Sequence, residues 1–450
     1  MPFLCSSPEI AVEQFFICCV RLAEIAIAVF RHAVRFSFES LFCCGERRIT
    51  LAGNCLAELF EDLGPVYVKI GQILSSRPDL LPPAFVNALT RLQDNSRPLP
   101  AAIIAAEIER AFGQPLPVLF PEFNPDPVAS ASIAQVHRAI LPDGRVVAVK
   151  VRRPDIEKRM KVDFQLLRCG ATAISRLPFM RVIPLVDLIE EIRKPVEMQL
   201  DFMREAASNR RLRSIFRCAE HLRIPATVDD RCTMSVLTMA FITDLRKATR
   251  SGDDNARRRE AAIAGLRALY KMIFVHGFVH ADMHPGNVLL DDPGDLVILD
   301  TGLMAELTED DRRRFVDFFF GLVNNDGPAC ARIVLEMARY RVPSCDVAGF
   351  EQAMIKLIAR HSALKSRDFE VTRFVYELID LQRIFGIRGS TSFIMVVLSM
   401  VVYDGICKLL YPECDFQAEA RPFLIVGRYG RGERSFIPLG SRPKHAVGAL

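Results

Sequence analysis

The sequence predicts an α+β fold in which a helical amino-terminal segment precedes a small sheet and a larger helical unit. Apolar residues recur at three- and four-residue spacing over residues 9–42 and 50–76, which indicates helices. Strand-like runs appear over residues 128–151, and helical spacing dominates after residue 244. The chain has 450 residues, half of them hydrophobic, so it has enough apolar material for a large buried core.

Prolines and turn residues mark several boundaries between the predicted helices and strands. After the first two helices, Pro82-Pro83 begins another helix and residues 98–112 form a further one. Pro142-Asp143-Gly144 joins two strands into an antiparallel hairpin. Helices are then expected over 155–177 and 185–216, the second interrupted at Pro195, and strands over 224–228, 233–241, 287–290 and 296–299. This order divides the chain into a helical extension (1–115), a sheet-containing unit (116–243) and a helical unit (244–450).

Composition narrows the functional classes. The net charge is only +4, and the arginine clusters are typical of solvated helix faces, so no nucleic-acid partner is expected. The 13 cysteines include no CxxC spacing, which indicates a reducing compartment and no zinc site. The amino-terminal residues lack a basic start before the first apolar run, so we expect no signal peptide and a cytoplasmic location.

Two apolar stretches are candidates for contact with a membrane. The run from Ser392 to Tyr403 is shorter than the roughly 20 residues that a spanning helix needs. The run from Gln14 to Phe30 is broken by Arg21 and Glu24, which suits either a packed helix or a helix lying on a membrane surface. Peripheral membrane association is therefore allowed, and packing is the simpler interpretation.

The densest group of polar residues lies in HGFVHADMHPGNVLLDDPGDLVILDTG, residues 276–302. Asp282, Asn287 and Asp300 have the order and spacing of a protein-kinase catalytic loop and metal-binding turn. Asp282 would act beside the phosphoryl acceptor, and the oxygens of Asn287 and Asp300 would hold Mg²⁺. We expect His280 to brace this loop and Gly302 to let the chain turn sharply. Taken alone, each residue is equally compatible with a turn or a helix cap.

The other half of a nucleotide site is expected upstream. Lys150 ends the apolar strand VVAVK, where an ammonium group would reach phosphates, and Glu205 lies in a later helix able to pair with it. A lysine at the end of a strand is usually only solvated. Its position before Asp282, Asn287 and Asp300, in the kinase order, favours the phosphate-binding interpretation.

Four sequence blocks resemble the UbiB/ADCK-type (aarF-domain) atypical kinases, a family associated with ubiquinone biosynthesis. They are KIGQ (69–72), ASASIAQVH (129–137), QLDFMREAASN (199–209) and HADMHPGN (280–287). The resemblance covers roughly residues 63–424. It implies a two-lobed, protein-kinase-like fold whose helical extension carries the KxGQ block and occludes the groove where a protein substrate would bind.

The resemblance also assigns roles to residues. The loop of Ala129, Ser130, Ala131 and Ser132 would cover the phosphates of ATP, together with Lys150. Because Cβ atoms restrict positive φ, an alanine-rich loop should clamp phosphates differently from a glycine-rich loop. Regulatory roles in the extension would fall to Lys69, Gln72, Gln199 and Asp201.

Two departures from the family pattern are evident. The family usually has a Glu-x-Asp pair where this chain has Gln199 and Asp201, so one negative charge is missing. The metal-binding turn is usually Asp-Phe-Gly, but Thr301 replaces the aromatic residue here. We expect the change at Thr301 to remove packing beneath the helix of Glu205 while leaving the metal carboxylate in place.

The sequence therefore predicts an ATP- and Mg²⁺-dependent atypical kinase or ATPase that supports isoprenoid-quinone (ubiquinone) biosynthesis at a membrane. Its acceptor would be a small molecule, a lipid or water, and its partners would include ATP and quinone precursors or lipids. Two alternatives stay open. One is a catalytically weak nucleotide-sensing protein that binds lipids, and the other is a small-molecule phosphotransferase, which shares the HxDxxxxN pattern.

Overall fold

The structure is a computed structural model that describes residues 8–75, 81–92, 97–176, 185–247, 255–362 and 369–430. The chain forms two compact units. The first runs to Phe202 and includes Asp230–Thr238, and the second contains Met203–Asp229 and the chain from Met239 onward. The expected three-part division at 115 and 243 stays a prediction, and the helical expectation for residues 431–450 lies outside the described residues.

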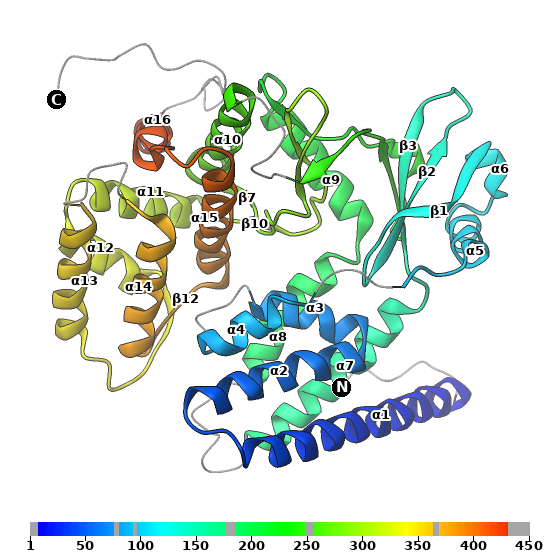
Figure 1. Ribbon diagram of the computed structural model, residues 1–450, viewed down its shortest axis with the longest axis horizontal. Helices are drawn as coiled ribbons and strands as arrows, with labels where there is room; N and C mark the ends of the chain where they lie inside the picture. The colour runs from blue at the N-terminus through cyan, green and yellow to red at the C-terminus, as the bar shows by residue number, and fades with distance from the viewer. Residues whose placement is uncertain are drawn as a thin grey trace. The chain divides into compact units, whose positions relative to one another are not determined.

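Helices and one sheet make up the first unit (Figure 1). Its helices are α1 (Pro8–Ser40), α2 (Glu46–Leu63), α3 (Pro65–Ser75), α4 (Pro83–Leu89), α5 (Ala101–Phe112), α6 (Leu116–Leu119), α7 (Ile156–Ile174) and α8 (Leu185–Met198). Its strands β1 (Glu122–Ser130), β2 (Ala134–Ile140) and β3 (Val146–Arg152) form an antiparallel meander that β5 (Val236–Ala240) extends.

Several boundaries in this unit differ from the sequence expectation. The predicted hairpin is confirmed as β2 and β3, but β1 was missed because Pro125 and Pro127 disguise it; the strand pairing is irregular at Pro127. The predicted interruption at Pro195 is wrong. Pro195 lies buried inside α8, and the helical run instead breaks over residues 199–201, before α9 (Phe202–Ile215).

The second unit is largely helical, with short strands around its functional loop. Its helices after α9 are α10 (Asn255–Tyr270), the π-helical turn η3 (Lys271–His276), α11 (Glu309–Val323), α12 (Gly327–Glu336), α13 (Val347–Ser362), α14 (Val371–Ile384), α15 (Thr391–Leu410) and α16 (Phe416–Tyr429). Phenylalanines from α11, α14 and α15 stack in its core, and α15 packs against α10 and α14 (Figure 1).

Short strands hold the loop of residues 276–302. β7 (Phe278–His280) pairs with β10 (Met304–Glu306), and β8 (Val288–Leu290) pairs with β9 (Leu296–Ile298), which confirms the expected short hairpin. β4 (Leu222–Arg223) and β6 (Arg246–Lys247) extend the β8–β9 pair to a four-stranded sheet of order β4-β9-β8-β6. β11 (Ala338–Arg341) pairs with β12 (Ile387–Gly389). The strand expected over 224–228 is wrong, because that segment contributes only an isolated bridge at Thr227.

The apolar helix α15 is longer than the run that the sequence suggested. Among the described residues it alone, over Ser392–Leu410, has the length and composition of a membrane span. However, 67% of an 18-residue window of this stretch is buried within the protein. A helix buried to that extent is accounted for as a core element.

The amino-terminal helix is attached by a buried ion pair. Arg21 of α1 donates two hydrogen bonds to the fully buried carboxylate of Asp163 on α7, at 2.6 and 3.1 Å, and a third to the backbone oxygen of Leu63 at 2.7 Å. Burial alone would lower the pKa of the Arg21 guanidinium, but the bonds to Asp163 and Glu24 outweigh it and raise the pKa.

Because removing one partner leaves an uncompensated buried charge, Asp163→Ala should destabilise the first unit by about 3–5 kcal/mol. The matched control is Glu39→Gln, which removes the exposed pair between Arg35 and Glu39 and should cost less than about 0.5 kcal/mol. Chemical denaturation measures both. Equal losses for the two variants would contradict the assigned role of Arg21 and Asp163.

Candidate functional site

A buried histidine connects the two parts of the predicted catalytic loop. His280 ends β7 and is completely inaccessible to solvent. Its Nδ1 atom accepts a hydrogen bond from the backbone N–H of Asp282 at 3.1 Å, and its Nε2 atom hydrogen-bonds to the backbone oxygen of Asp300. Since the amide of Asp282 must donate, Nδ1 is the bare nitrogen, and Nε2–H donates to the carbonyl of Asp300.

The environment keeps this ring neutral. Burial is the largest influence on the pKa of His280 and lowers it, while the backbone of Asp300 and the charges of Asp282 and Asp300 act in the opposite direction. The net effect is a lowered pKa. A neutral His280 with one donor and one acceptor is the form that both hydrogen bonds require, so the expected bracing role has a physical basis.

The π-helical turn and a glycine lead the chain into this histidine. Residues Lys271–His276 form the π-helical turn, and Gly277 follows it with a φ of 60°. That left-handed conformation favours glycine. The chain can therefore turn directly from helix into β7, which ends at His280.

Asn287 lies in position to offer an oxygen. Its side-chain Nδ2 donates to the backbone oxygen of Asp282 at 3.0 Å, so its Oδ1 points the other way. The backbone N–H of Leu299 donates to the backbone oxygen of Asn287 at 3.0 Å. This bond and the β8–β9 pairing bring Asn287 close in space to Asp300, although thirteen positions separate them in the chain.

The turn of residues 300–302, predicted from the sequence to bind metal, packs against α9. The carboxylate of Asp300 accepts a hydrogen bond from the N–H of Gly302 at 2.8 Å. A Cβ atom on Gly302 would lie 3.1 Å from Asp300 Oδ1 and 3.3 Å from Glu205 Oε2. Gly302 does not have positive φ, so its backbone conformation does not require glycine, as the expected sharp turn would; glycine instead leaves space beside two carboxylates that a Cβ atom would crowd.

Thr301 fills the position of the missing aromatic residue without leaving a gap. Its side chain is 1% exposed, and its hydroxyl donates to the backbone oxygen of Glu205 at 3.1 Å. The expected loss of packing beneath the helix is therefore replaced by a hydrogen bond and close contact. A single sequence could not reveal this substitution of one interaction for another.

Asp282 keeps a carboxylate that solvent reaches, with 29% of its side chain exposed. His284 lies nearby, with its Nε2 atom 3.9 Å from Asp282 Oδ2. The Nδ1 atom of His284 accepts from the N–H of Gly286 at 2.9 Å, so its Nε2–H faces Asp282. No role was predicted for His284 from the sequence, although its place two residues after Asp282 was an available signal.

The phosphate-binding residues predicted upstream belong to the first unit. Lys150 is half-buried on β3, and its Nζ atom lies 5.1 Å from the ring centre of Phe202, which is fully buried. This cation–π contact constrains the lysine and was missed from the sequence, although Phe202 stands inside the QLDFMREAASN block. Glu205 belongs to the second unit, and its pairing with Lys150 stays a prediction.

Arg153 holds the alanine-rich loop. Ala129 and Ser130 end β1, and Arg153 donates to the backbone oxygen of Ala131 at 2.8 Å and to the hydroxyl of Ser130 at 2.9 Å. None of the loop residues has positive φ, in agreement with the restriction that Cβ atoms impose. Ser132 is fully buried, so a phosphate contact from its hydroxyl would require exposure first.

The predicted regulatory residues lie in the first unit, two of them buried and two partly buried. Lys69 lies on α3 and is 8% exposed, and Gln72 donates from its side chain to the backbone oxygen of Leu92 at 3.2 Å. Gln199 is 7% exposed and Asp201 is partly buried, both just before α9. Their regulatory roles stay predictions.

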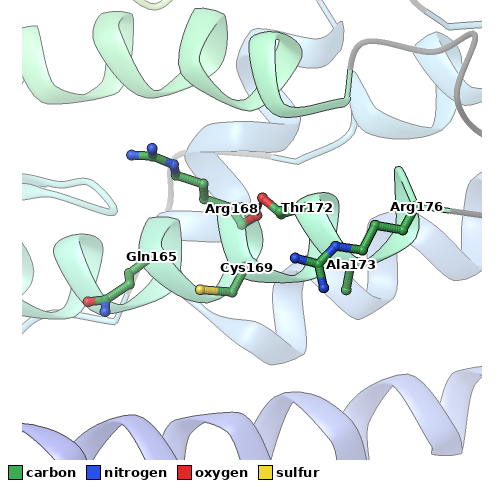
Figure 2. Close-up of a pocket in the computed structure, with 6 residues that line it drawn as sticks. All are labelled: Gln165, Arg168, Cys169, Thr172, Ala173 and Arg176. Atoms are coloured by element: carbon green, nitrogen blue, oxygen red, sulfur yellow. Dashed lines mark hydrogen bonds between the residues drawn. The ribbon is translucent and has the colours of Figure 1, made fainter. Parts of the chain in front are cut away.

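A hollow of about 550 Å³ lies along α7, and no predicted site residue lines it (Figure 2). It is lined by Gln165, Arg168, Cys169, Thr172, Ala173 and Arg176. This lining contains no carboxylate or histidine for metal or proton chemistry.

The metal ligands predicted from the sequence, Asn287 and Asp300, stay predictions. The described residues contain no group of three or more His, Cys, Asp or Glu side chains able to hold an ion. One amide oxygen and one carboxylate, from Asn287 and Asp300, would form a sparse oxygen set. Mg²⁺ typically binds such a set when phosphates and water complete its coordination.

Comparison with known proteins gives consistent matches. Residues 91–334 match the family described as ABC1 atypical kinase-like domain. A probable protein kinase UbiB of Tolumonas auensis is 32% identical over 83% of this chain and 70% of its own length. The corresponding protein of Marinobacter nauticus is 33% identical over 83% of this chain and 69% of its own. The structure of Rv3197 from Mycobacterium tuberculosis, solved with erythromycin, has a TM-score of 0.55 at 23% identity, covering 80% of this chain and 91% of that one.

His280 should make stability depend on pH. Its folded-state pKa lies below the unfolded value of about 6.5, so the unfolded chain takes up the proton first as the pH falls. Stability is therefore fully present above that pH and declines below it. The measurement is thermal unfolding of the wild type and His280→Gln between pH 8 and pH 5.

The wild type should be more stable at pH 8, and the difference between the two proteins should shrink towards pH 5. His137 is also buried with a lowered pKa, but it is common to both proteins and cancels. A difference that stays constant across this range would show that His280 is not a neutral brace.

Proposed function

This chain belongs to the ABC1 atypical kinase-like family of UbiB-type phosphotransferases, and we propose that it binds ATP with Mg²⁺ and transfers or hydrolyses the terminal phosphoryl group. The observation that carries this proposal is the bridge through His280, which fixes the backbone at Asp282 and Asp300 together. We assign Asp282 to the acceptor and Asn287 and Asp300 to the metal.

The proposed chemistry requires little of the chain beyond placement and charge. Mg²⁺ would neutralise the phosphate oxygens when bound. Asp282 would orient the attacking hydroxyl or water and accept its proton. Its partly exposed carboxylate and its fixed backbone suit that task, since an acceptor can approach while the loop stays in place.

The remaining assignments follow the order of the kinase elements. Lys150 would grip the phosphates, Glu205 would orient Lys150, and the loop of residues 129–132 would cover the nucleotide. The contact between Lys150 and Phe202 supports this by limiting where the ammonium group reaches. The acceptor is proposed to be a small molecule, a lipid or water, in support of isoprenoid-quinone synthesis.

Turnover of radiolabelled ATP tests the proposal. Asp282→Asn should retain Mg²⁺-dependent ATP binding and lower phosphate release or transfer by about 10²–10⁴-fold. Asp300→Asn should lose both binding and turnover. The matched control is Asp292→Asn, which removes an exposed carboxylate from the β8–β9 turn and should behave like the wild type.

Two outcomes would count against the proposed enzymatic activity. If ATP binds but turnover does not depend on Asp282, the chain is a nucleotide-sensing binding protein. If ATP does not bind at all, the nucleotide assignment of these residues is wrong.

We further propose that α1 places the protein on a membrane surface. A row of large apolar side chains along α1 and just after its end is exposed, with exposed fractions of 52–78%: Phe16, Ile27, Phe30, Val34 and Phe38 on the helix, and Leu41 and Phe42 beyond it. Contiguous exposed apolar surface of this kind marks an interaction site, and a helix with one apolar and one polar face is typical of interfacial binding.

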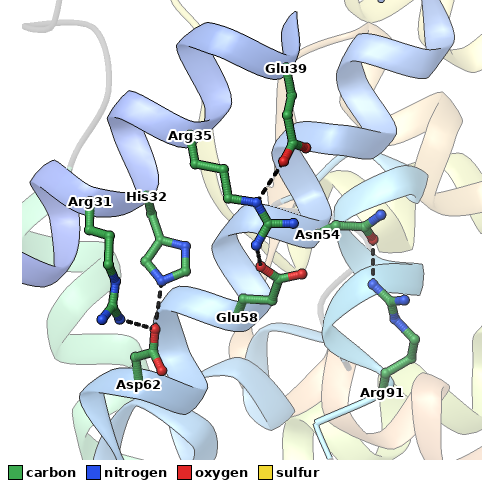
Figure 3. Close-up of polar contacts among 8 residues, drawn as sticks. All are labelled: Arg31, His32, Arg35, Glu39, Asn54, Glu58, Asp62 and Arg91. Carbon is green, nitrogen blue, oxygen red and sulfur yellow. Dashed lines mark hydrogen bonds and ion pairs between the residues drawn. The ribbon is translucent and has the colours of Figure 1, made fainter.

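The charged side chains of α1 are engaged on its other face (Figure 3). Arg31 and His32 both contact Asp62 of α2, and Arg35 contacts Glu58. These ion pairs leave the apolar row uninterrupted. Exposed Arg47 and Arg48 lie shortly after Phe42, on the first turn of α2, which favours a bilayer carrying anionic lipids.

Vesicle flotation tests this surface. Binding should be stronger to vesicles containing phosphatidylserine than to pure phosphatidylcholine, and Phe30→Asp with Phe38→Asp should weaken it by at least about tenfold. The control is Val118→Asp on α6, which changes an equally exposed apolar residue elsewhere. Unchanged flotation of the α1 variant, or dimerisation through α1 in place of vesicle binding, would exclude the membrane assignment.

A further inference from the structure

Thr301 connects two elements that the proposed reaction needs. It stands between the metal-binding carboxylate of Asp300 and Gly302, and its hydroxyl donates to the backbone oxygen of Glu205 on α9 at 3.1 Å. The side chain is 1% exposed, so water does not compete for this bond. The contact joins a turn and a helix that are 96 residues apart in sequence.

The side chains around this bond are also closely placed. Glu205 is 2% exposed, and its Oε2 atom and Asp300 Oδ1 both lie close to the position that a Cβ atom on Gly302 would occupy, at 3.3 and 3.1 Å. The N–H of Gly302 holds Asp300 Oδ1 at 2.8 Å. The hydroxyl of Thr301 thus fixes the backbone at the point where the two carboxylates come together.

We propose that Thr301 is a positioning residue that couples α9 to the metal-binding turn, so that Glu205 and Asp300 are placed by one hydrogen-bonded element. An aromatic residue at this position would secure the helix by packing alone, which tolerates sliding. A hydrogen bond has a preferred distance and direction and defines the register of the helix against the turn. The functional part of this inference rests on the proposed ATP site, whereas the coupling itself is a property of the free protein.

The first measurement is amide hydrogen exchange of the nucleotide-free protein. Thr301→Val keeps the shape and removes the donor, and it should speed exchange about threefold to tenfold both at Gly302 and at residues 206–209 of α9. Thr301→Ser keeps the donor and should restore slow exchange in both places. Faster exchange at only one of the two, or no rescue by serine, would overturn the coupling.

The second measurement is the Mg²⁺ concentration that gives half-maximal ATP turnover. It should rise about threefold to tenfold in Thr301→Val, return in Thr301→Ser, and leave the KM for ATP at saturating Mg²⁺ nearly unchanged. The matched control is Thr372→Val, which removes a similar hydrogen bond, to Asp404 at 2.7 Å, in the helices α14 and α15.

The control should lose stability without changing the Mg²⁺ dependence. A Mg²⁺ curve for Thr301→Val that matches the wild type would overturn the positioning role. If the wild type does not turn over ATP, the proposed function fails, and the exchange experiment still decides whether Thr301 couples the two elements.

Discussion

One hydrogen-bonded imidazole ring determines the arrangement of the candidate site. His280 can hold the amide of Asp282 and the carbonyl of Asp300 at once only if it is neutral, with Nδ1 bare and Nε2 protonated. Complete burial supplies that condition by lowering its pKa. The side chains that carry the proposed chemistry stay near solvent, while the group that aligns them is inside the core. The aligning imidazole is thus shielded from solvent, whereas the side chains proposed to react are not.

Other residues of the candidate site are also held in place by hydrogen bonds and close contacts. The side-chain nitrogen of Asn287 donates a hydrogen bond within the loop, so its side-chain oxygen points the other way. Gly302 leaves room for the carboxylates of Asp300 and Glu205. Where a glycine-rich loop and an aromatic turn residue are usual, this chain has Arg153 holding an alanine-rich loop and Thr301 holding α9. Both replacements exchange flexible or purely apolar contacts for directed hydrogen bonds. Each hydrogen bond forms within one of the two units, so each unit holds its own share of the proposed nucleotide-binding residues in a fixed conformation.

The sequence predicted the parts of this site that depend on local spacing. The family, the α+β fold and the β8–β9 hairpin followed from motifs and turn residues that act over a few positions. Contacts over long sequence separations did not follow. The bond from Thr301 to Glu205, the ring of Phe202 beneath Lys150 and the buried pair of Arg21 with Asp163 depend on tertiary packing that periodicity does not encode. Prolines also misled, since Pro127 lies within a strand and Pro195 lies within a helix.

Asn287 and Asp300 are proposed to hold one metal ion together with bound ATP. Electron paramagnetic resonance of Mn²⁺, which substitutes for Mg²⁺ at oxygen sites, measures it directly in the presence of ATP. The wild type should take up Mn²⁺ only with ATP present, and Asn287→Ala and Asp300→Asn should each weaken uptake by at least about tenfold while remaining folded. Mn²⁺ uptake in both variants equal to that of the wild type would show that Asn287 and Asp300 do not form the metal site.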